Sequence, residues 1–314
     1  MNKESKILIV GHGDIMEQSL VKALRAKGFL KVVSSSDIAL DTTIQSSVYE
    51  FFSEERPEYV FLTSIKSGGI EANEKNPAAF FYANSESQNN IVYAAYKFGV
   101  KKLMYVASSC VYPKDAAQPM VPECLMMGAM EKTSEAYAMA KLAGITLCQA
   151  FRKQYGFHAI IVIPATVYGP QKKADLATSH VVGALIQKFY QAKAASRGEV
   201  IVWGTGKPRR EFLFSDDFAQ ACLFLMDHYE GSDVINIGTG EDVAIQDLAQ
   251  MIKDIAQFPG KIVFDPARPD GAMRKLLNSD AIKHLGWSPK VSLQEGVRQA
   301  WDHYAQEQGK EKGK

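Results

Sequence analysis

The sequence predicts an α/β fold with a doubly wound parallel sheet and a smaller α/β substrate domain toward the C-terminus. Short apolar runs alternate with stretches of helical spacing over the first half of the chain, which is typical of a parallel sheet covered by helices on both faces. The first apolar run, at 6–10, leads into Gly11 and Gly13, as expected of a buried strand that ends in a tight turn. After Pro170 the alternation breaks, which marks a second domain.

The elements follow from the same periodicities. We expect strands at 6–10, 30–33, 59–63, 101–109 and 158–165, and helices at 18–27, 43–53, 79–98, 135–154 and 181–192. A short strand is expected at 199–203, and the segment 212–226 is expected to rejoin the first sheet. We therefore predict a dinucleotide-binding domain at 1–168, rejoined by about 213–240, and a substrate-binding domain made of 169–212 and 241–314.

Charge and cysteine usage exclude several classes of function. The chain has 36 Lys and Arg against 35 Asp and Glu, a formal net charge of +1, so no overall field favours nucleic acid or an anionic membrane. Its four cysteines have neither the spacing of metal ligands nor the density of a disulfide scaffold, which predicts reduced thiols and no metal site. The N-terminal apolar run is too short for a signal peptide or a membrane span. We expect a cytoplasmic protein.

A serine, a tyrosine and a lysine form the first candidate site. Tyr137 and Lys141 are four residues apart in a predicted helix, so they share a face, and the ammonium would favour the phenolate. Ser108 and Cys110 follow a predicted strand at the edge where doubly wound sheets bind ligands, and they would face the same side if the chain stayed extended. Ser109 would face away. The spacing of Tyr137 and Lys141 alone also fits two residues on a surface helix.

Several separated segments give the chain a specific resemblance. They are SSCVYP at 108–113, EAYAMAKLAGI at 135–145, YGP at 168–170, SHVV at 179–182, VWGTGKPRREF at 202–212, NIGTG at 236–240 and PDGAMRKLLN at 269–278. Together they resemble the GDP-L-fucose synthase family of extended short-chain dehydrogenase/reductases, almost from end to end. The resemblance implies a Rossmann-type sheet and a GDP-linked keto-deoxy-sugar substrate. It also implies an epimerase/reductase that inverts two carbons beside a ketone and then reduces the ketone with NADPH.

The resemblance assigns two sets of catalytic roles. In the reduction, Tyr137 would donate the proton, Lys141 would support it and bind the cofactor ribose, and Ser108 would hydrogen-bond the sugar oxygen. In the epimerisation, Cys110 and His180 would be the acid/base pair, with a nearby cation assisting the thiolate. Taken alone, Cys110 also fits a small buried apolar residue and His180 a satisfied polar side chain.

The resemblance also implies ligand-binding residues. The substrate is expected at Ser109, Lys188, Trp203, Arg210 and Asp270. The cofactor is expected at Gly11, Gly13, Asp14, Ile15, Met16, Asp37, Lys141, Pro164, Val167 and His180. The planar fork of Arg210 suits a diphosphate, although a surface arginine, and core packing for Trp203, are the plainer interpretations.

The glycine loop departs from the family pattern G-x-x-G-x-x-G. Here only Gly11 is in place, while Asp14 and Glu17 stand where the other glycines are expected. If both side chains point inward, they would repel the cofactor phosphates; alternatively Gly13 forms the turn, and both carboxylates favour the helix N-terminus from the solvent side. Gly13 also stands where an arginine would contact the extra phosphate of NADP. NADP is the expected cofactor with NAD possible, and Asp37 is either a ribose ligand or a turn residue.

Further departures leave the function open between three hypotheses. The segment 171–179 differs from the family, and Thr166 replaces an expected asparagine. The first hypothesis is a GDP-4-keto-6-deoxy-sugar epimerase/reductase; the second is a reductase or single-carbon epimerase on another nucleotide sugar. The third is a non-catalytic nucleotide-sugar-binding paralogue. The family resemblance also implies a homodimer that pairs the helices at 79–98 and 135–154.

Overall fold

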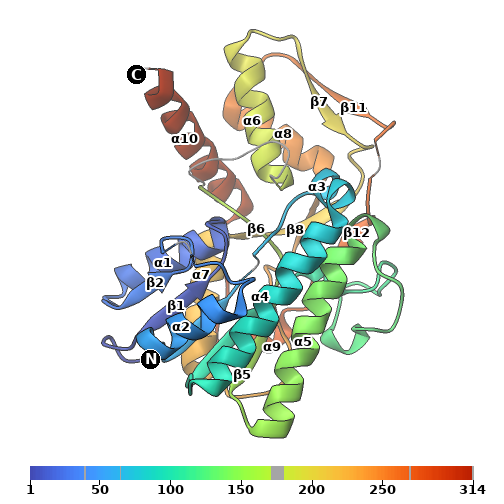
Figure 1. The fold of residues 1–314 in the computed structure, drawn as a ribbon. Helices are drawn as coiled ribbons and strands as arrows, with labels where there is room; N and C mark the ends of the chain where they lie inside the picture. Colours follow the sequence, from blue (N-terminus) through green and yellow to red (C-terminus); the bar gives the residue numbers. More distant parts are fainter. Residues whose placement is uncertain (39, 64, 171–179, 269, 313–314) are drawn as a thin grey trace.

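A six-stranded parallel sheet forms the centre of the molecule (Figure 1), whose computed structural model describes residues 1–314 except 39, 64, 171–179, 269, 313 and 314. Its strand order is β2-β1-β3-β4-β5-β9. The bounds are β1 Ile7–Val10, β2 Val32–Ser34, β3 Tyr59–Leu62, β4 Lys102–Val106, β5 Ala159–Pro164 and β9 Ile235–Ile237. Apart from the edge strand β2, the strands are mostly apolar and buried along nearly their whole length, as expected of strands covered on both faces. The predicted α/β class with a doubly wound parallel sheet is confirmed.

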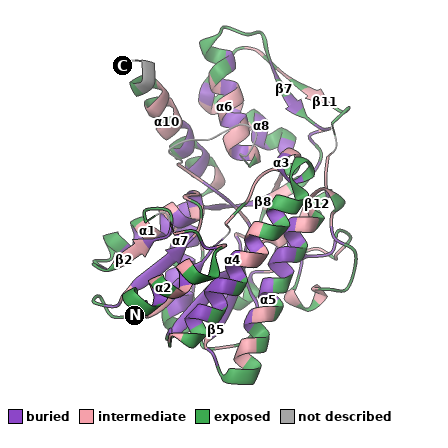
Figure 2. Cartoon of the chain, in the orientation of Figure 1, coloured by how far each residue is buried: buried purple, intermediate pink, exposed green. Residues whose placement is uncertain are grey.

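Helices cover the two faces of this sheet (Figure 2). On one face α1 (Ile15–Ala26) packs beside α7 (Ser215–His228); on the other, α2 (Gln45–Glu55), α4 (Pro77–Lys97) and α5 (Glu135–Tyr155) lie side by side. The sequence order turns back at β1, so the carboxyl ends of β1 and β3 form the switch point where open sheets bind ligands. The short helix α3 (Ile70–Lys75), which the sequence did not predict, follows β3.

The chain returns to the first sheet after residue 213. Helix α7 packs against α1, and β9 pairs in parallel with β5. Lys102 of β4 ties this segment down, because its buried ammonium donates to the carbonyls of Met226 at 2.8 Å and Tyr229 at 2.7 Å. These contacts support the proposed return of 213–240 to the dinucleotide-binding domain.

A second hydrophobic core lies on the far side of the switch point. It gathers α6 (Val181–Ala194), α8 (Ile245–Ala256) and α10 (Leu293–Lys312) around the small parallel pair β7 (Glu199–Trp203) and β11 (Lys261–Asp265). The remaining strands, β10 (Asp242–Ala244) and β12 (Arg274–Lys275), flank β8 (Arg209–Phe214), and α9 (Asp280–His284) packs beside β9. This separate core supports the proposed substrate domain.

A two-stranded ribbon lies between the two cores. It is formed by β6 (Thr166–Tyr168) and the C-terminal half of β8, which pair in parallel. Because side chains alternate along a strand, Val167 and Leu213 enter the first core while Tyr168, Phe212 and Phe214 enter the second. The ribbon therefore has one face in each core.

Two predicted element ends are wrong, for local reasons. The strand expected at 101–109 ends at Val106, because residues Ser109–Val111 form a 3-10 turn. The helix expected from Gln18 begins at Ile15, because the Asp14 carboxylate accepts the amide N–H of Glu17 at 3.0 Å and caps the helix. Within the described residues, no helix is long and apolar enough to cross a membrane.

Candidate active site

Ser108 and Cys110 meet at the end of β4. The Oγ of Ser108 lies 2.8 Å from the Sγ of Cys110, so each is within hydrogen-bonding distance of the other. The predicted proximity is present, but its predicted cause is wrong: the chain is not extended here, since Ser108 begins a 3-10 turn over Ser109–Val111. The turn itself brings the two side chains together.

Tyr137 extends this group from the first turn of α5. Its ring is 7% exposed and packs edge-on against Phe80 of α4, with ring centroids 6.2 Å apart. Cys110 packs against the same small apolar cluster. The serine, the thiol and the phenol thus occupy one site at the carboxyl end of β4.

Lys141 lies one turn further along α5, buried below the site. It is 1% exposed, and its Nζ donates to the main-chain oxygen of Thr63 at 3.4 Å, at the end of β3. Burial lowers the pKa of Lys141 to about 7, a shift that the charges of Cys110, Cys148 and Asp14 oppose. Burial therefore disfavours the charged form of this lysine.

Tyr105 fixes the position of this lysine. The ammonium of Lys141 lies 4.4 Å from the centre of the Tyr105 ring, a cation–π contact. The Tyr105 hydroxyl donates to Gln88 Oε1 at 2.7 Å and also contacts the main-chain oxygen of Lys141. Gly144 leaves the room this requires, because a Cβ there would overlap the Tyr105 hydroxyl. The sequence analysis assigned no role to Tyr105. The one local indication was that a polar hydroxyl interrupts an otherwise apolar run.

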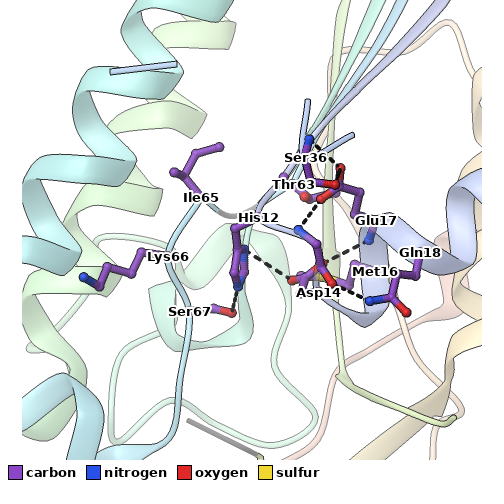
Figure 3. Close-up of polar contacts among 12 residues, drawn as sticks. His12, Asp14, Met16, Glu17, Gln18, Ser36, Thr63, Ile65, Lys66 and Ser67 are labelled. Carbon is purple, nitrogen blue, oxygen red and sulfur yellow. Dashed lines mark hydrogen bonds and ion pairs between the residues drawn. The ribbon is translucent and has the colours of Figure 1, made fainter. Parts of the chain in front are cut away.

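The glycine loop matches neither interpretation of its two carboxylates (Figure 3). Gly13 has a φ of +78°, as expected of a turn glycine, and Asp14 caps α1. Glu17, however, does not face solvent: it is 1% exposed and turns inward beneath the loop. It accepts from the N–H of Gly13 and from the hydroxyls of Ser34 and Ser36 at the end of β2.

His180 approaches the loop from the second core. It is the N-cap residue of α6 and lines a small hollow together with Val167. The residue is exposed to solvent, yet the surrounding protein lowers the pKa of its imidazole, and the Asp14 carboxylate opposes that shift. His12 lies 3.9 Å from Asp14, so two imidazoles neighbour this carboxylate.

The remaining cofactor candidates are mostly placed at the same edge. Pro164 ends β5, Ile15 is buried at the start of α1, and Met16 is partly buried beside it. Asp37 follows the end of β2; its exposed carboxylate pairs with Arg25 at 3.8 Å, and its amide closes a turn onto Ser34.

Trp203 carries two cations on an exposed ring. The side chain is 46% exposed, which argues against simple core packing. Lys188 Nζ lies 4.9 Å and the Arg268 guanidinium 4.8 Å from the ring centre. Lys188 is also anchored to the main-chain oxygen of Ile201 at 2.9 Å. This group suits a planar or anionic part of a ligand.

Arg210 belongs to a second charged group, on β8. Burial lowers the pKa of its guanidinium, and the carboxylates of Glu131 and Asp270 oppose that shift. Asp270 itself accepts from the N–H and hydroxyl of Thr205, both at 2.7 Å, and so holds the turn after Trp203. The geometry gives Asp270 a positioning role in addition to any ligand contact.

Lys275 is a second residue that sequence analysis missed. Its backbone lies opposite that of Arg210 where β12 pairs in parallel with β8. Its charge interacts with Cys110 and Glu131. It is thus a candidate for the cation that the Cys110 thiolate needs. Lys275 lies within the segment 269–278 that carries the family resemblance, but the sequence analysis assigned it no role. The divergent segment 171–179 lies outside the described residues.

Comparison with known proteins identifies the family of this chain. The model of the NAD dependent epimerase/dehydratase family matches residues 7–238. The chain belongs to this family. It is an NAD(P)-dependent enzyme of the oxidoreductase/epimerase type.

Three named proteins are similar to this chain over nearly its whole length. GDP-L-fucose synthase 1 of Arabidopsis thaliana is 45% identical over 96% of this chain and 94% of its own. A GDP-6-OMe-4-keto-L-xylo-heptose reductase from C. jejuni has a TM-score of 0.90 and 33% identity, over 98% and 99% of the two chains. MlghC, a GDP-mannoheptose C4 reductase from Campylobacter jejuni with NADP bound, has a TM-score of 0.87 and 35% identity, over 97% and 99%.

A dinucleotide fits the observed residues at the nicotinamide end. Lys141 is buried one turn of α5 beyond Tyr137, and its Nζ donates to the main-chain oxygen of Thr63, so this amine is placed where it could also donate to a ribose hydroxyl. At the adenosine end, the Glu17 carboxylate lies against the glycine loop. The N–H of Gly13 is already engaged, and a Cβ on Gly11 would lie 2.6 Å from Glu17 Oε2.

Proposed function

We propose that this chain is a GDP-L-fucose synthase-like epimerase/reductase that acts on a GDP-4-keto-6-deoxy-sugar. One observation carries the proposal: the Cys110 thiol contacts Ser108 and packs in the cluster of Tyr137. An acid/base group for epimerisation therefore adjoins the set of groups suited to reducing a ketone. Relatives named GDP-L-fucose synthase, at up to 46% identity, support the substrate class.

In the reduction, Tyr137 delivers a proton to the ketone oxygen. Ser108 donates a hydrogen bond to the same oxygen, where negative charge develops. The nearby Lys141 ammonium favours the phenolate left on Tyr137. When bound, a reduced nicotinamide dinucleotide supplies the hydride to the carbonyl carbon. Lys141 would hold its ribose, and Pro164 and Val167 would lie along it.

In the epimerisation, Cys110 and His180 act as the acid/base pair. A carbon beside a ketone loses its proton to a base, and the carbon regains a proton on the opposite face from an acid. Cys110 comes from the 3-10 turn after β4 and His180 from the N-terminal end of α6, so the two belong to elements of different cores. Lys275 would place a positive charge near the Cys110 sulfur.

The second core is proposed to hold the GDP part of the substrate. Arg210 suits the diphosphate, and Trp203 with Lys188 suits the nucleoside end. Asp270 supports the turn between them, and Ser109 lies beside the sugar.

Turnover with the keto-sugar tests the whole proposal. Purified protein incubated with GDP-4-keto-6-deoxymannose and a reduced cofactor in D₂O should oxidise the cofactor and incorporate deuterium on both sides of the former ketone. Tyr137→Phe should lose the reduction and keep the deuterium exchange, whereas His180→Asn should lose the exchange. Neither turnover nor exchange in the wild type would refute the proposal and favour a non-catalytic binding protein.

A second candidate is a C4 reductase of another GDP-sugar, without epimerisation. It is favoured by the heptose reductases among the similar structures, at 33% and 35% identity. The same D₂O experiment separates the candidates, because a reductase of this kind consumes cofactor without deuterium uptake. A GDP-4-keto-heptose would then be the better substrate.

We also propose a homodimer formed through α4 and α5. These neighbouring helices expose large apolar side chains, namely Phe81, Tyr82, Tyr93, Tyr96, Met139 and Tyr155. Burying them against the same face of a second copy would give a four-helix bundle. Light scattering after gel filtration should give about twice the monomer mass, and Tyr82→Glu should reduce it. The four unpaired cysteines agree with the proposed cytoplasmic location.

The cofactor proposal begins from NADP. Similar structures carry NADP, whereas the loop lacks the expected arginine, so NAD is the alternative.

A further inference from the structure

Glu17 is a carboxylate buried where the cofactor loop would ordinarily have a glycine. Both of its oxygens act as acceptors: Oε2 receives the N–H of Gly13, and Oε1 receives the hydroxyls of Ser34 and Ser36. The N–H of Ser36 also points to Oε1, at 3.4 Å. Because amide N–H groups can only donate, this is the pattern of an ionised carboxylate (Figure 3).

The hydroxyl proton of Ser36 is used in a hydrogen bond within this cluster. Ser36 Oγ lies 2.8 Å from Glu17 Oε1 and 2.8 Å from Ser34 Oγ. Whichever of these two oxygens it donates to, the proton stays inside the cluster. Ser36 is exposed at the end of β2, so toward solvent it offers only lone pairs. A ligand that meets Ser36 must therefore donate a hydrogen bond.

The end of the second strand is where sheets of this type meet the adenosine ribose. An unmodified ribose has a 2′-hydroxyl, which can donate to Ser36. The 2′-phosphate of NADP is an anion that only accepts, so it meets lone pairs on Ser36 and the negative charge of Glu17 behind them. Arg25, the basic residue beside this turn, is paired with Asp37 at 3.8 Å.

We propose that Glu17 makes this enzyme select NADH over NADPH. The inference rests on the proposed function for the existence of a cofactor site, and it departs from the NADP found with similar structures. Glu17 acts through Ser36. It holds the hydroxyl proton of Ser36, so that the serine oxygen can only accept a hydrogen bond from the ribose, and it supplies a negative charge that disfavours a phosphate.

Calorimetric titration of the full chain with NADH and NADPH tests the proposal. NADH should bind at least tenfold more tightly than NADPH at pH 7.5 and low salt, and 5′-AMP should bind more tightly than 2′,5′-ADP. Equal or tighter binding of NADPH would overturn the inference while leaving the proposed function intact. Binding of neither dinucleotide would overturn both, whereas turnover of the keto-sugar with NADPH preferred would overturn only the inference.

Variants assign the preference to Glu17. Glu17→Gln removes the charge and adds an amide that can donate to Ser36, so the ratio of the two affinities should fall at least threefold. Glu54→Gln makes the same change at an exposed position of α2 and should leave the ratio unchanged. Ser36→Ala, at an exposed position, keeps the charge but removes the acceptor, so NADH binding should weaken more than NADPH binding. An unchanged ratio in both Glu17→Gln and Ser36→Ala would overturn the role of Glu17.

Discussion

Replacing Lys141 by methionine should stabilise the protein while it removes activity. Lys141 is buried, and loss of hydration lowers its pKa from 10.5 to about 7. Folding at low pH must therefore bury an ammonium group. Methionine has a similar stem and can lie over the Tyr105 ring without that charge. This proposed catalytic lysine thus costs stability, as groups at active sites often do.

The pH dependence gives the size of the effect. Below pH 7 both the folded and the unfolded chain hold the Lys141 proton, so this group adds no pH dependence there. Between pH 7 and 10.5 the unfolded chain holds one proton more, so the stability of the wild type rises with pH by about 1.4 kcal/mol per unit. From pH 7 to pH 9 this is about 2.7 kcal/mol, or roughly 4 °C in Tm for a chain of this length.

Calorimetric melting of the ligand-free protein at pH 6 and pH 9 measures this. Lys141→Met should exceed the wild type in stability at pH 6, and the difference should shrink by about 2.7 kcal/mol at pH 9. Lys102→Met is the matched control, since Lys102 is also buried but donates to several carbonyl groups. It should lose ~2–5 kcal/mol at both pH values because those carbonyls lose their donor. Parallel profiles for Lys141→Met and the wild type would refute the reasoning.

Three other substitutions test the site and its packing. Cys110→Ser should slow deuterium exchange beside the ketone by about 100-fold or more; unchanged exchange, followed by mass spectrometry, would remove Cys110 from the mechanism. Lys275→Met should slow alkylation of Cys110 by iodoacetamide several-fold at pH 7, because the thiolate loses a favourable charge; an equal labelling rate would contradict this. Gly144→Ala should lower stability by ~1–3 kcal/mol in urea unfolding, because the new methyl group overlaps the Tyr105 hydroxyl; an unshifted midpoint would disprove the clash.

Local patterns in the sequence were sufficient to predict most of the main sheet and four of its helices. Apolar runs predicted β1 to β5 but not β9, and helical spacing predicted α1, α2, α4 and α5 but not α7. The sequence analysis did not predict the strands β6, β8, β10 and β12. They are two to six residues long, and their partners lie far away in the chain, so no local period marks them.

Side-chain direction in the site depended on contacts that the sequence does not show. The spacing of Tyr137 and Lys141 correctly placed both on α5, because helical geometry is local. The direction of Glu17 could not be predicted, since the serines that hold it come from β2. Lys275 was missed for the same reason: its approach to Cys110 depends on the pairing of β12 with β8.

The ribbon of β6 and β8 couples the unfolding of the two halves of the molecule. Unfolding the substrate-binding half would expose Tyr168, Phe212 and Phe214, while the same two strands still filled the other core with Val167 and Leu213. Neither half can come apart without uncovering apolar surface that belongs to a strand shared with its neighbour. We therefore expect cooperative melting in a single transition, and a mutation deep in either half should be felt by the whole enzyme.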